Sequence, residues 1–169
     1  MINGTILLDK PKNITSNKAL SIIKRDLSLN KAGIVGILDP LASGMLPIVI
    51  NQGTKLAQYI ESYEKEYLVT SQLGYISSTG DEEGTISPLK VDNLKNLNIN
   101  QIKKTINLFL GQQKQIPPMY SGLKVKGTKL YKLARKGITI ERLPRNINIF
   151  NIELVDFTNN QMILNVICS

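Results

Sequence analysis

One aspartate in a glycine-bounded loop is the first candidate for chemistry in this 169-residue chain. Asp39 lies within the run GILDPLASG, residues 36–44. Because Pro40 disfavours the helical region for the residue before it, Asp39 is expected to have an extended backbone. The flanking glycines allow a tight path that presents one carboxylate at the apex of a loop. The alternative is a plain Asp-Pro turn, in which the carboxylate bonds its own backbone.

A tyrosine at the start of a strand is the second candidate. Lys65-Glu66-Tyr67 opens an alternating segment that predicts a strand from Tyr67 to Leu73. An accessible tyrosine there can stack on a nucleobase or transfer a proton. The alternative is a packing role, which is common for tyrosines in strands.

A cluster of basic residues near the C-terminal third is the third candidate. The stretch from Lys124 to Arg145 holds eight basic residues and one acid, Glu141. A helix over Lys129–Lys136 would bury its leucines and turn three lysines outward, at positions Lys129, Lys132 and Lys136. Together with Lys124, such a cationic face suits a phosphate backbone. A solvated lysine face is the alternative.

The acidic turn from Gly80 to Gly84 is a weaker candidate for a metal site. It could hold a divalent ion loosely, but it lacks the spacing of a calcium loop, so a surface turn is favoured. The chain has no histidine and one cysteine, Cys168, so the usual zinc ligand sets cannot be assembled. A single cysteine also excludes an internal disulfide and fits a reducing compartment. We therefore expect no metal site.

The charge balance favours a polyanionic partner. Twenty-one Lys+Arg against thirteen Asp+Glu give a formal net charge of +8 and a pI near 9.6, and each neutralised phosphate releases condensed counterions. Heavy use of Lys, Asn and Ile, as in an AT-rich genome, is the alternative source of that surplus. No run of about eighteen apolar residues occurs, and the first ten residues do not have the pattern of a signal peptide. A cytoplasmic protein is expected.

The order of the predicted elements indicates an α+β domain on a mixed, largely antiparallel sheet with flanking helices. One compact domain is expected from the length. Its final strand, Met162–Cys168, is apolar on both faces and has no following partner, which predicts a truncated domain that self-associates. The remaining expected elements are a strand at Gly4–Asp9, a helix capped by Thr15 or Ser16, a loop at Gly33–Gly44, a strand at Met45–Ile50, a short helix capped by Thr54, a helix at Ile102–Leu110, a turn at Lys126-Gly127 and a strand at Asn146–Phe157.

These segments, taken in order, resemble the TruB family of RNA pseudouridine synthases over nearly the whole chain. The run QIPPMYSGLKV from Gln115 to Val125, followed by Ala134-Arg135-Lys136-Gly137, is the most specific match. The other matching segments are Leu8-Asp9-Lys10-Pro11, Thr15-Ser16, Gly33–Gly44, Gly53-Thr54-Lys55, Lys65-Glu66-Tyr67, Leu73-Gly74, Thr79-Gly80-Asp81, Gly84 and Leu130-Tyr131.

The resemblance implies isomerisation of uridine to pseudouridine in the T loop of tRNA, at position 55, without a cofactor. It implies a pseudouridine synthase catalytic fold that acts as a monomer when the full domain is present. Asp39 takes the position of the catalytic carboxylate. Residues implied in substrate binding are Tyr67, Ile34, Lys55 and Asp81; those implied at the RNA backbone are Lys124, Lys129, Lys132 and Lys136.

Three departures from the family pattern affect this interpretation. Ile34 stands where the family usually has a histidine, and Asn13 replaces a turn glycine. The chain ends at Ser169, just before the family's Lys-Gly-Thr-Tyr-Ile-Arg motif, whose arginine pairs with the catalytic aspartate. We expect residues 1–169 to be the N-terminal part of the catalytic domain, without the RNA-binding PUA domain. A catalytically impaired tRNA-binding remnant of the same family is the alternative.

Overall fold

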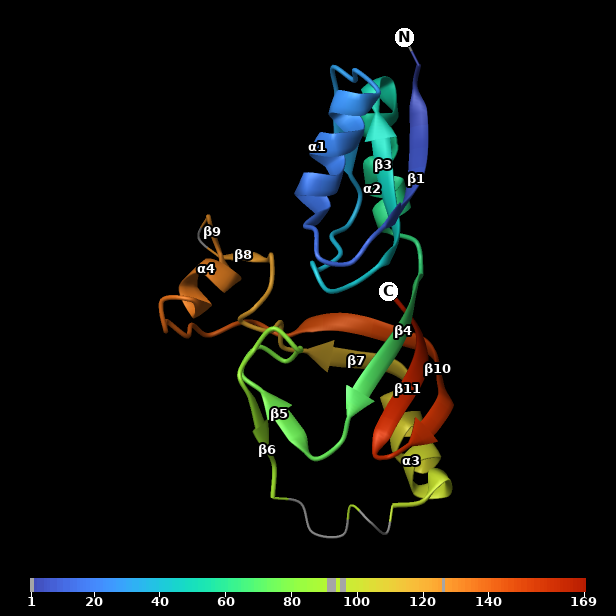
Figure 1. Ribbon diagram of the computed structural model, residues 1–169, viewed down its shortest axis with the longest axis vertical. Helices are drawn as coiled ribbons and strands as arrows, with labels where there is room; N and C mark the ends of the chain where they lie inside the picture. Colours follow the sequence, from blue (N-terminus) through green and yellow to red (C-terminus); the bar gives the residue numbers. More distant parts are fainter. Residues whose placement is uncertain (1, 91–93, 95–96, 126) are drawn as a thin grey trace. The chain divides into compact units, whose positions relative to one another are not determined.

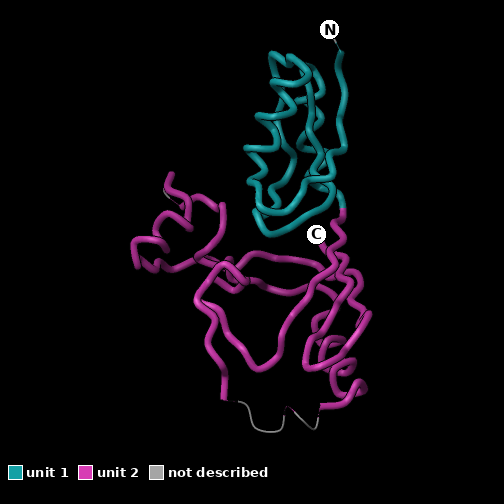
Figure 2. The backbone as a smooth tube through the Cα atoms, viewed as in Figure 1, with its two compact units in different colours: residues 1–63 teal, residues 64–169 magenta. Residues whose placement is uncertain are grey.

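The computed structural model describes residues 2–90, 94, 97–125 and 127–169, and these form two compact units. The first unit comprises residues 1–63 and the second comprises residues 64–169, shown in teal and magenta in Figure 2. One compact domain was expected from the length; the structure has two compact units, and each is described by itself below.

The first unit is a small antiparallel sheet with one long helix (Figure 1). Its strand order is β1-β3-β2, so β3 is central. The predicted strands at the N-terminus and at Met45–Ile50 are confirmed. The elements are β1 (Gly4–Lys10), α1 (Ser16–Asp26), β2 (Ala32–Ile34), β3 (Gly44–Ile50), the 3-10 helix η1 (Asn51–Leu56) and α2 (Ala57–Glu61).

The core of the first unit is built from β3 and α1. Leu46, Ile48 and Val49 of the central strand are almost completely buried, and Ala19 of α1 is buried as well. Removing these side chains from water supplies most of the stabilisation of the unit, at about 25 cal/mol per Å² of apolar surface. A charged side chain in this unit, Lys10 at the end of β1, is also fully buried.

The second unit is built on a four-stranded antiparallel sheet in the order β4-β11-β10-β7. Two small hairpins, β5-β6 and β8-β9, and two helices complete it (Figure 1). The elements are β4 (Lys65–Gln72), β5 (Tyr75–Ser77), β6 (Ile86–Pro88), α3 (Ile99–Ile106), the 3-10 turn η3 (Asn107–Phe109), β7 (Gly111–Gln115), β8 (Lys124–Val125), β9 (Thr128–Lys129), α4 (Leu130–Ala134), β10 (Arg145–Thr158) and β11 (Gln161–Cys168).

Helix α3 packs on one face of this sheet and forms its core. Ile102 and Ile106 of the helix are buried against Leu164 of β11. The helix begins with a capping box, in which Asn98 and Gln101 each bond the other's backbone amide. Partly buried residues around the cluster are Ile152, Leu154, Phe157, Met162 and Val166.

The expected α+β class is confirmed, and each strand pair in the described ranges is antiparallel. The expectation for the last strand was wrong. Strand β11 pairs with β10 on one side and with β4 on the other, so it is central and has both neighbours. Its apolar character on both faces is that of an interior strand, and the predicted self-association loses its physical basis.

Three local predictions also need correction. Thr54 does not cap a helix: it lies inside η1, where its hydroxyl donates to the Asn51 carbonyl, and α2 begins later without a side-chain cap. The loop predicted at Gly33–Gly44 is shorter, since its ends belong to β2 and β3. Of the turn at Lys126-Gly127, Lys126 lies outside the described residues and Gly127 has a φ of +80°. Within the described ranges, no helix is long and apolar enough to cross a membrane.

Candidate functional site

The loop that carries Asp39 connects β2 to β3 and is fixed by backbone hydrogen bonds. Pro40 follows Asp39 into a tight turn, in which the Ala42 amide donates to the Asp39 carbonyl at 3.1 Å. At the entrance of the loop, the Val35 amide donates to the Pro47 carbonyl at 2.9 Å. The main chain therefore forms the Asp-Pro turn of the alternative interpretation, but main-chain groups close it and not the Asp39 carboxylate.

The side chain of Asp39 is exposed and is not used to build that turn. Among the described residues, no hydrogen bond or ion pair reaches its carboxylate. This differs from the usual loop aspartate, whose carboxylate bonds a nearby amide. An exposed carboxylate on a fixed backbone is available to an incoming substrate.

Two further predicted site residues lie in the same unit. Ile34 ends β2, where it is half-buried opposite Ile48 of β3, so an apolar side chain suits the position. Lys55 is exposed on η1. No acid forms an ion pair with it in the described part of the chain, so its ammonium group is available to an anion.

Tyr67 is the third residue of β4, an edge strand of the four-stranded sheet. It lies opposite Val166 of β11, and paired residues of antiparallel strands share a face. Since Val166 packs against the α3 cluster, Tyr67 is on the helix-bearing face, near the end of the strand. Its side chain is 40% exposed, which leaves part of the ring accessible for stacking.

Asp81 lies in the turn between β5 and β6, and its carboxylate stabilises that turn. The Thr79 hydroxyl donates to its Oδ1 at 2.5 Å, and the Glu83 amide donates to the same oxygen at 3.1 Å. Gly84 closes the turn against Ser77 and Thr79, with no room for a side chain. A substrate would have to compete with these internal partners for the Asp81 carboxylate.

The basic segment contains a shorter helix than predicted, with one tyrosine between two cations. In α4, Leu130 is fully buried, as expected. The Lys129 ammonium lies 5.7 Å and the Arg135 guanidinium 5.4 Å from the centre of the Tyr131 ring. Such cation–π contacts hold the two cations in place without neutralising their charge. Lys124, Lys132 and Lys136 are exposed.

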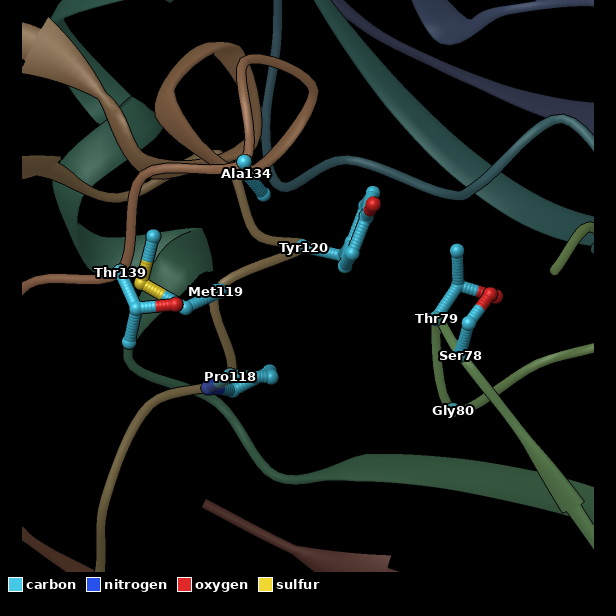
Figure 3. A pocket seen from close by; sticks show the side chains of 9 residues that line it. Ser78, Thr79, Gly80, Pro118, Met119, Tyr120, Ala134 and Thr139 are labelled. Carbon is cyan, nitrogen blue, oxygen red and sulfur yellow. The ribbon is translucent and has the colours of Figure 1, made fainter.

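A cavity of about 450 Å³ lies within the second unit (Figure 3). In this view Tyr120 lies between Met119 and Thr139 on one side and the turn residues Ser78 and Thr79 on the other. Each of the three contributing segments carries a motif that can be recognised in the sequence, but no sequence pattern predicts that they meet. Hydroxyl groups and an aromatic ring, without a charged side chain, suit an uncharged base edge. The remaining lining residues are Gly80, Pro118, Ala134 and Gly137.

The predicted site residues are divided between the two units. The first unit carries Asp39, Ile34 and Lys55; the second carries Tyr67, Asp81, Lys124, Lys129, Lys132 and Lys136. That the two sets meet at one substrate remains a prediction. In the described ranges, no three acidic, cysteine or histidine side chains are grouped as metal ligands.

Residues 24–169 match the model of the TruB family pseudouridylate synthase N-terminal domain. The chain belongs to the TruB family. It is 42% identical to tRNA pseudouridine synthase B of Nitrosococcus oceani over 99% of this chain and 54% of the relative. It is 45% identical to the protein of the same name from Blochmanniella pennsylvanica, over 99% of this chain and 64% of that protein. The TruB-family chain thus spans about half to two thirds of the length of these relatives.

A solved structure supports the fold of this TruB-family chain. The crystal structure of a Cbf5-Nop10-Gar1 complex contains a chain that superposes with a TM-score of 0.70 at 26% identity, covering 98% of this chain and 39% of that one. Both units of the present chain are covered by this match. The pseudouridine synthase fold expected from the resemblance is therefore confirmed.

Proposed function

We propose that this protein isomerises uridine to pseudouridine in the T loop of tRNA, at position 55. The observation that carries the proposal is the Asp39 carboxylate, which is exposed on a fixed loop and has no partner among the described residues. Membership of the TruB family supports it, as do relatives named tRNA pseudouridine synthase B.

The reaction breaks the bond between C1′ and N1 of uridine and forms a bond between C1′ and C5. A proton leaves C5, and N1 gains one. No electrons enter or leave, so neither a redox cofactor nor a metal is required. What the reaction needs is a carboxylate beside C1′, and Asp39 attacks or assists at that carbon.

Tyr67 provides the aromatic surface for the uracil ring. The base must leave its stack to be reached, which costs a few kcal/mol and less for a loop nucleotide than for a paired one. Stacking on an accessible aromatic ring recovers about 1–3 kcal/mol per base. The partly exposed ring of Tyr67 is suited to this role, and the apolar Ile34 takes the place of a polar contact to the flipped nucleotide.

The lysines hold the RNA backbone. A net charge of +8 attracts tRNA at long range. Lys55 supplies a cation in the first unit, and Asp81 contributes to substrate binding through the turn that it organises. The residues proposed to contact phosphates in the basic segment are Lys124, Lys129, Lys132 and Lys136.

We further propose that residues 1–169 are the N-terminal part of one catalytic domain, since one family model covers most of both units. The full domain acts as a monomer on tRNA in the cytoplasm, without a metal.

A tRNA-binding protein with little turnover is the second candidate, and Ile34 favours it. This position usually holds a histidine in the family, and here the apolar side chain is half-buried opposite Ile48. Ile34→His in the full-length protein tests the alternative. A large gain in turnover at constant tRNA affinity supports an impaired enzyme, whereas unchanged turnover supports a site adapted to isoleucine.

The proposal is tested by Asp39→Asn in the full-length protein. Tritium release from C5-labelled uridine in a T-arm RNA reports turnover, and a titration with the same RNA reports affinity. Turnover should be lost while affinity stays within about twofold, because a transition-state interaction is removed rather than uniform binding. Asp26→Asn, at the exposed far end of α1, is the matched control and should retain both. Persistent turnover in Asp39→Asn refutes the assignment.

A further inference from the structure

The start of helix α1 is attached to the residue immediately before Asp39. The Ser16 hydroxyl donates to the Leu38 carbonyl at 2.8 Å and accepts from the Leu38 amide at 3.0 Å. Ser16 is only 2% exposed, so this attachment is shielded from water. One side chain thereby satisfies both main-chain groups of a loop residue that lies outside any strand.

The residue immediately after Asp39 is attached to the same region. The Asn13 amide donates to the Pro40 carbonyl at 2.7 Å, with Asn13 in a left-handed conformation at a φ of +66°. The fully buried Lys10 holds this turn, since its ammonium donates to the carbonyls of Pro11 and Ile14, both at 2.9 Å. In Figure 1 the loop between β1 and α1 lies beside the loop between β2 and β3.

The two attachments leave Asp39 between fixed neighbours. The peptide group before Asp39 is held through the Leu38 carbonyl, and the one after it is held through the Asp39 carbonyl, which accepts from the Ala42 amide at 3.1 Å. Because both peptide groups are held, the direction of the Cα–Cβ bond of Asp39 is held as well. The carboxylate can then remain exposed and unpaired while its position is still defined. A displacement of about 1 Å at a reacting group can reduce the rate by about a hundredfold, so such support has kinetic value.

We propose that Ser16 is a positioning residue for Asp39, and that it acts on turnover rather than on RNA binding. This rests on the proposed function of Asp39. Under this proposal Ser16 does not contact the substrate. It defines where the Asp39 carboxylate stands relative to C1′, through the main chain of Leu38.

The neighbouring residue offers a matched control for helix stability. The Thr15 hydroxyl accepts from the Lys18 amide at 3.1 Å and caps α1, and among the described residues no hydrogen bond joins it to the Asp39 loop. Thr15→Ala should destabilise the helix by removing this cap. Ser16→Ala removes the attachment to Leu38 instead. The two variants separate loss of stability from loss of position.

The experiment compares both variants of the full-length protein at a temperature where each is folded by circular dichroism. Ser16→Ala should lower kcat by about tenfold to a hundredfold, with KM for T-arm RNA within about twofold. Thr15→Ala should lower the melting temperature and keep kcat. If Ser16→Ala keeps the wild-type kcat, or if Thr15→Ala loses as much kcat, Ser16 has no positioning role.

Two further variants keep the test decisive. Ser16→Cys keeps a similar side-chain size, but its thiol is a weak donor and a weak acceptor, so the attachment to Leu38 is weakened while the packing is kept. If Ser16→Ala does not fold, a reduced kcat with unchanged KM in Ser16→Cys supports the proposal, and a wild-type kcat contradicts it. Asp39→Asn distinguishes a failure of the proposed function from a failure of the proposed role of Ser16. Persistent turnover in Asp39→Asn overturns the proposed function itself, whereas an inactive Asp39→Asn beside a fully active Ser16→Ala overturns only the role of Ser16.

Discussion

Asp39 and Asp81 are both exposed and both lie in tight turns, but their carboxylates are used differently. Asp81 accepts hydrogen bonds from the Thr79 hydroxyl and the Glu83 amide, so it stabilises its own turn. The Asp39 carboxylate accepts none from the described residues, and its loop is held by Ser16 and Asn13 from outside. A carboxylate becomes available for chemistry when other groups take over the support of its backbone.

The difference can be tested by making the same substitution at both positions. Asp39→Asn removes the charge proposed to act on C1′ and should lower turnover by about a thousandfold or more. Asp81→Asn keeps an oxygen acceptor in its turn and should lower turnover by less than about tenfold. Tritium release from T-arm RNA measures both. Equal losses would show that Asp81 also takes part in the chemistry and would abolish the contrast.

The basic segment of the second unit provides a second contrast with Asp39, because its lysines should affect tRNA affinity and not turnover. Alanine at Lys129, Lys132 and Lys136 should weaken tRNA binding and reduce the slope of log K against log salt by about two to three, at about 0.7–0.9 per lost phosphate contact. Turnover at saturating RNA should persist. Three exposed lysines elsewhere in the unit, Lys103, Lys104 and Lys114, provide the matched triple control. An unchanged slope in the first triple variant contradicts the assignment.

Tyr67→Phe probes the proposed stacking surface and should have a smaller effect. The aromatic face is retained and only the hydroxyl is lost, so turnover should fall by less than about tenfold. Tyr67→Leu, which removes the ring, should cost about 1–3 kcal/mol of stacking. Steady-state kinetics on the same RNA compares the two. Similar behaviour of both variants would assign Tyr67 a packing role.

The smallest expected effect is on the stability of the acidic turn. Asp81→Ala removes the acceptor of two hydrogen bonds at an exposed site and should lower the free energy of unfolding by about 1 kcal/mol. Asp39→Ala should change it by less than about half of that, since its carboxylate has no partner among the described residues. Urea denaturation followed by circular dichroism measures both. A larger loss at Asp39 would mean that its carboxylate supports the fold.

The sequence predicted the apolar elements well and the polar contacts poorly. Strands β10 and β11 begin and end within one residue of their predicted bounds, because alternating apolar residues define β10 and a run that is apolar on both faces defines β11. Strand β7 was missed, since its sequence GQQKQ has no apolar alternation and its pairing with β10 alone makes it a strand.

The residues of the candidate site were predicted from the sequence, but the hydrogen bonds that hold the backbone around Asp39 were not. Asp39 was identified from Pro40 and the flanking glycines, which act locally. The attachment of Ser16 to Leu38 joins residues 22 positions apart, so no local pattern could reveal it. Thr54 was misplaced for a similar reason: Gly53 packs directly on the backbone of Gly4, and this distant contact sets the course of η1.

The central position of β11 has a consequence for how the protein is made. Strands β4 and β11 pair in register from Lys65 with Cys168 to Gln72 with Gln161, about a hundred residues apart along the chain. Pairings of such separation are slow to form, and a nascent chain emerges from the ribosome at about 5–20 residues per second. Units with short-range contacts, such as β1-β3-β2, can fold as they emerge. The sheet of the second unit can be completed only after residues 161–168 have been synthesised. Until then, strand β4, which carries Tyr67, cannot form this pairing.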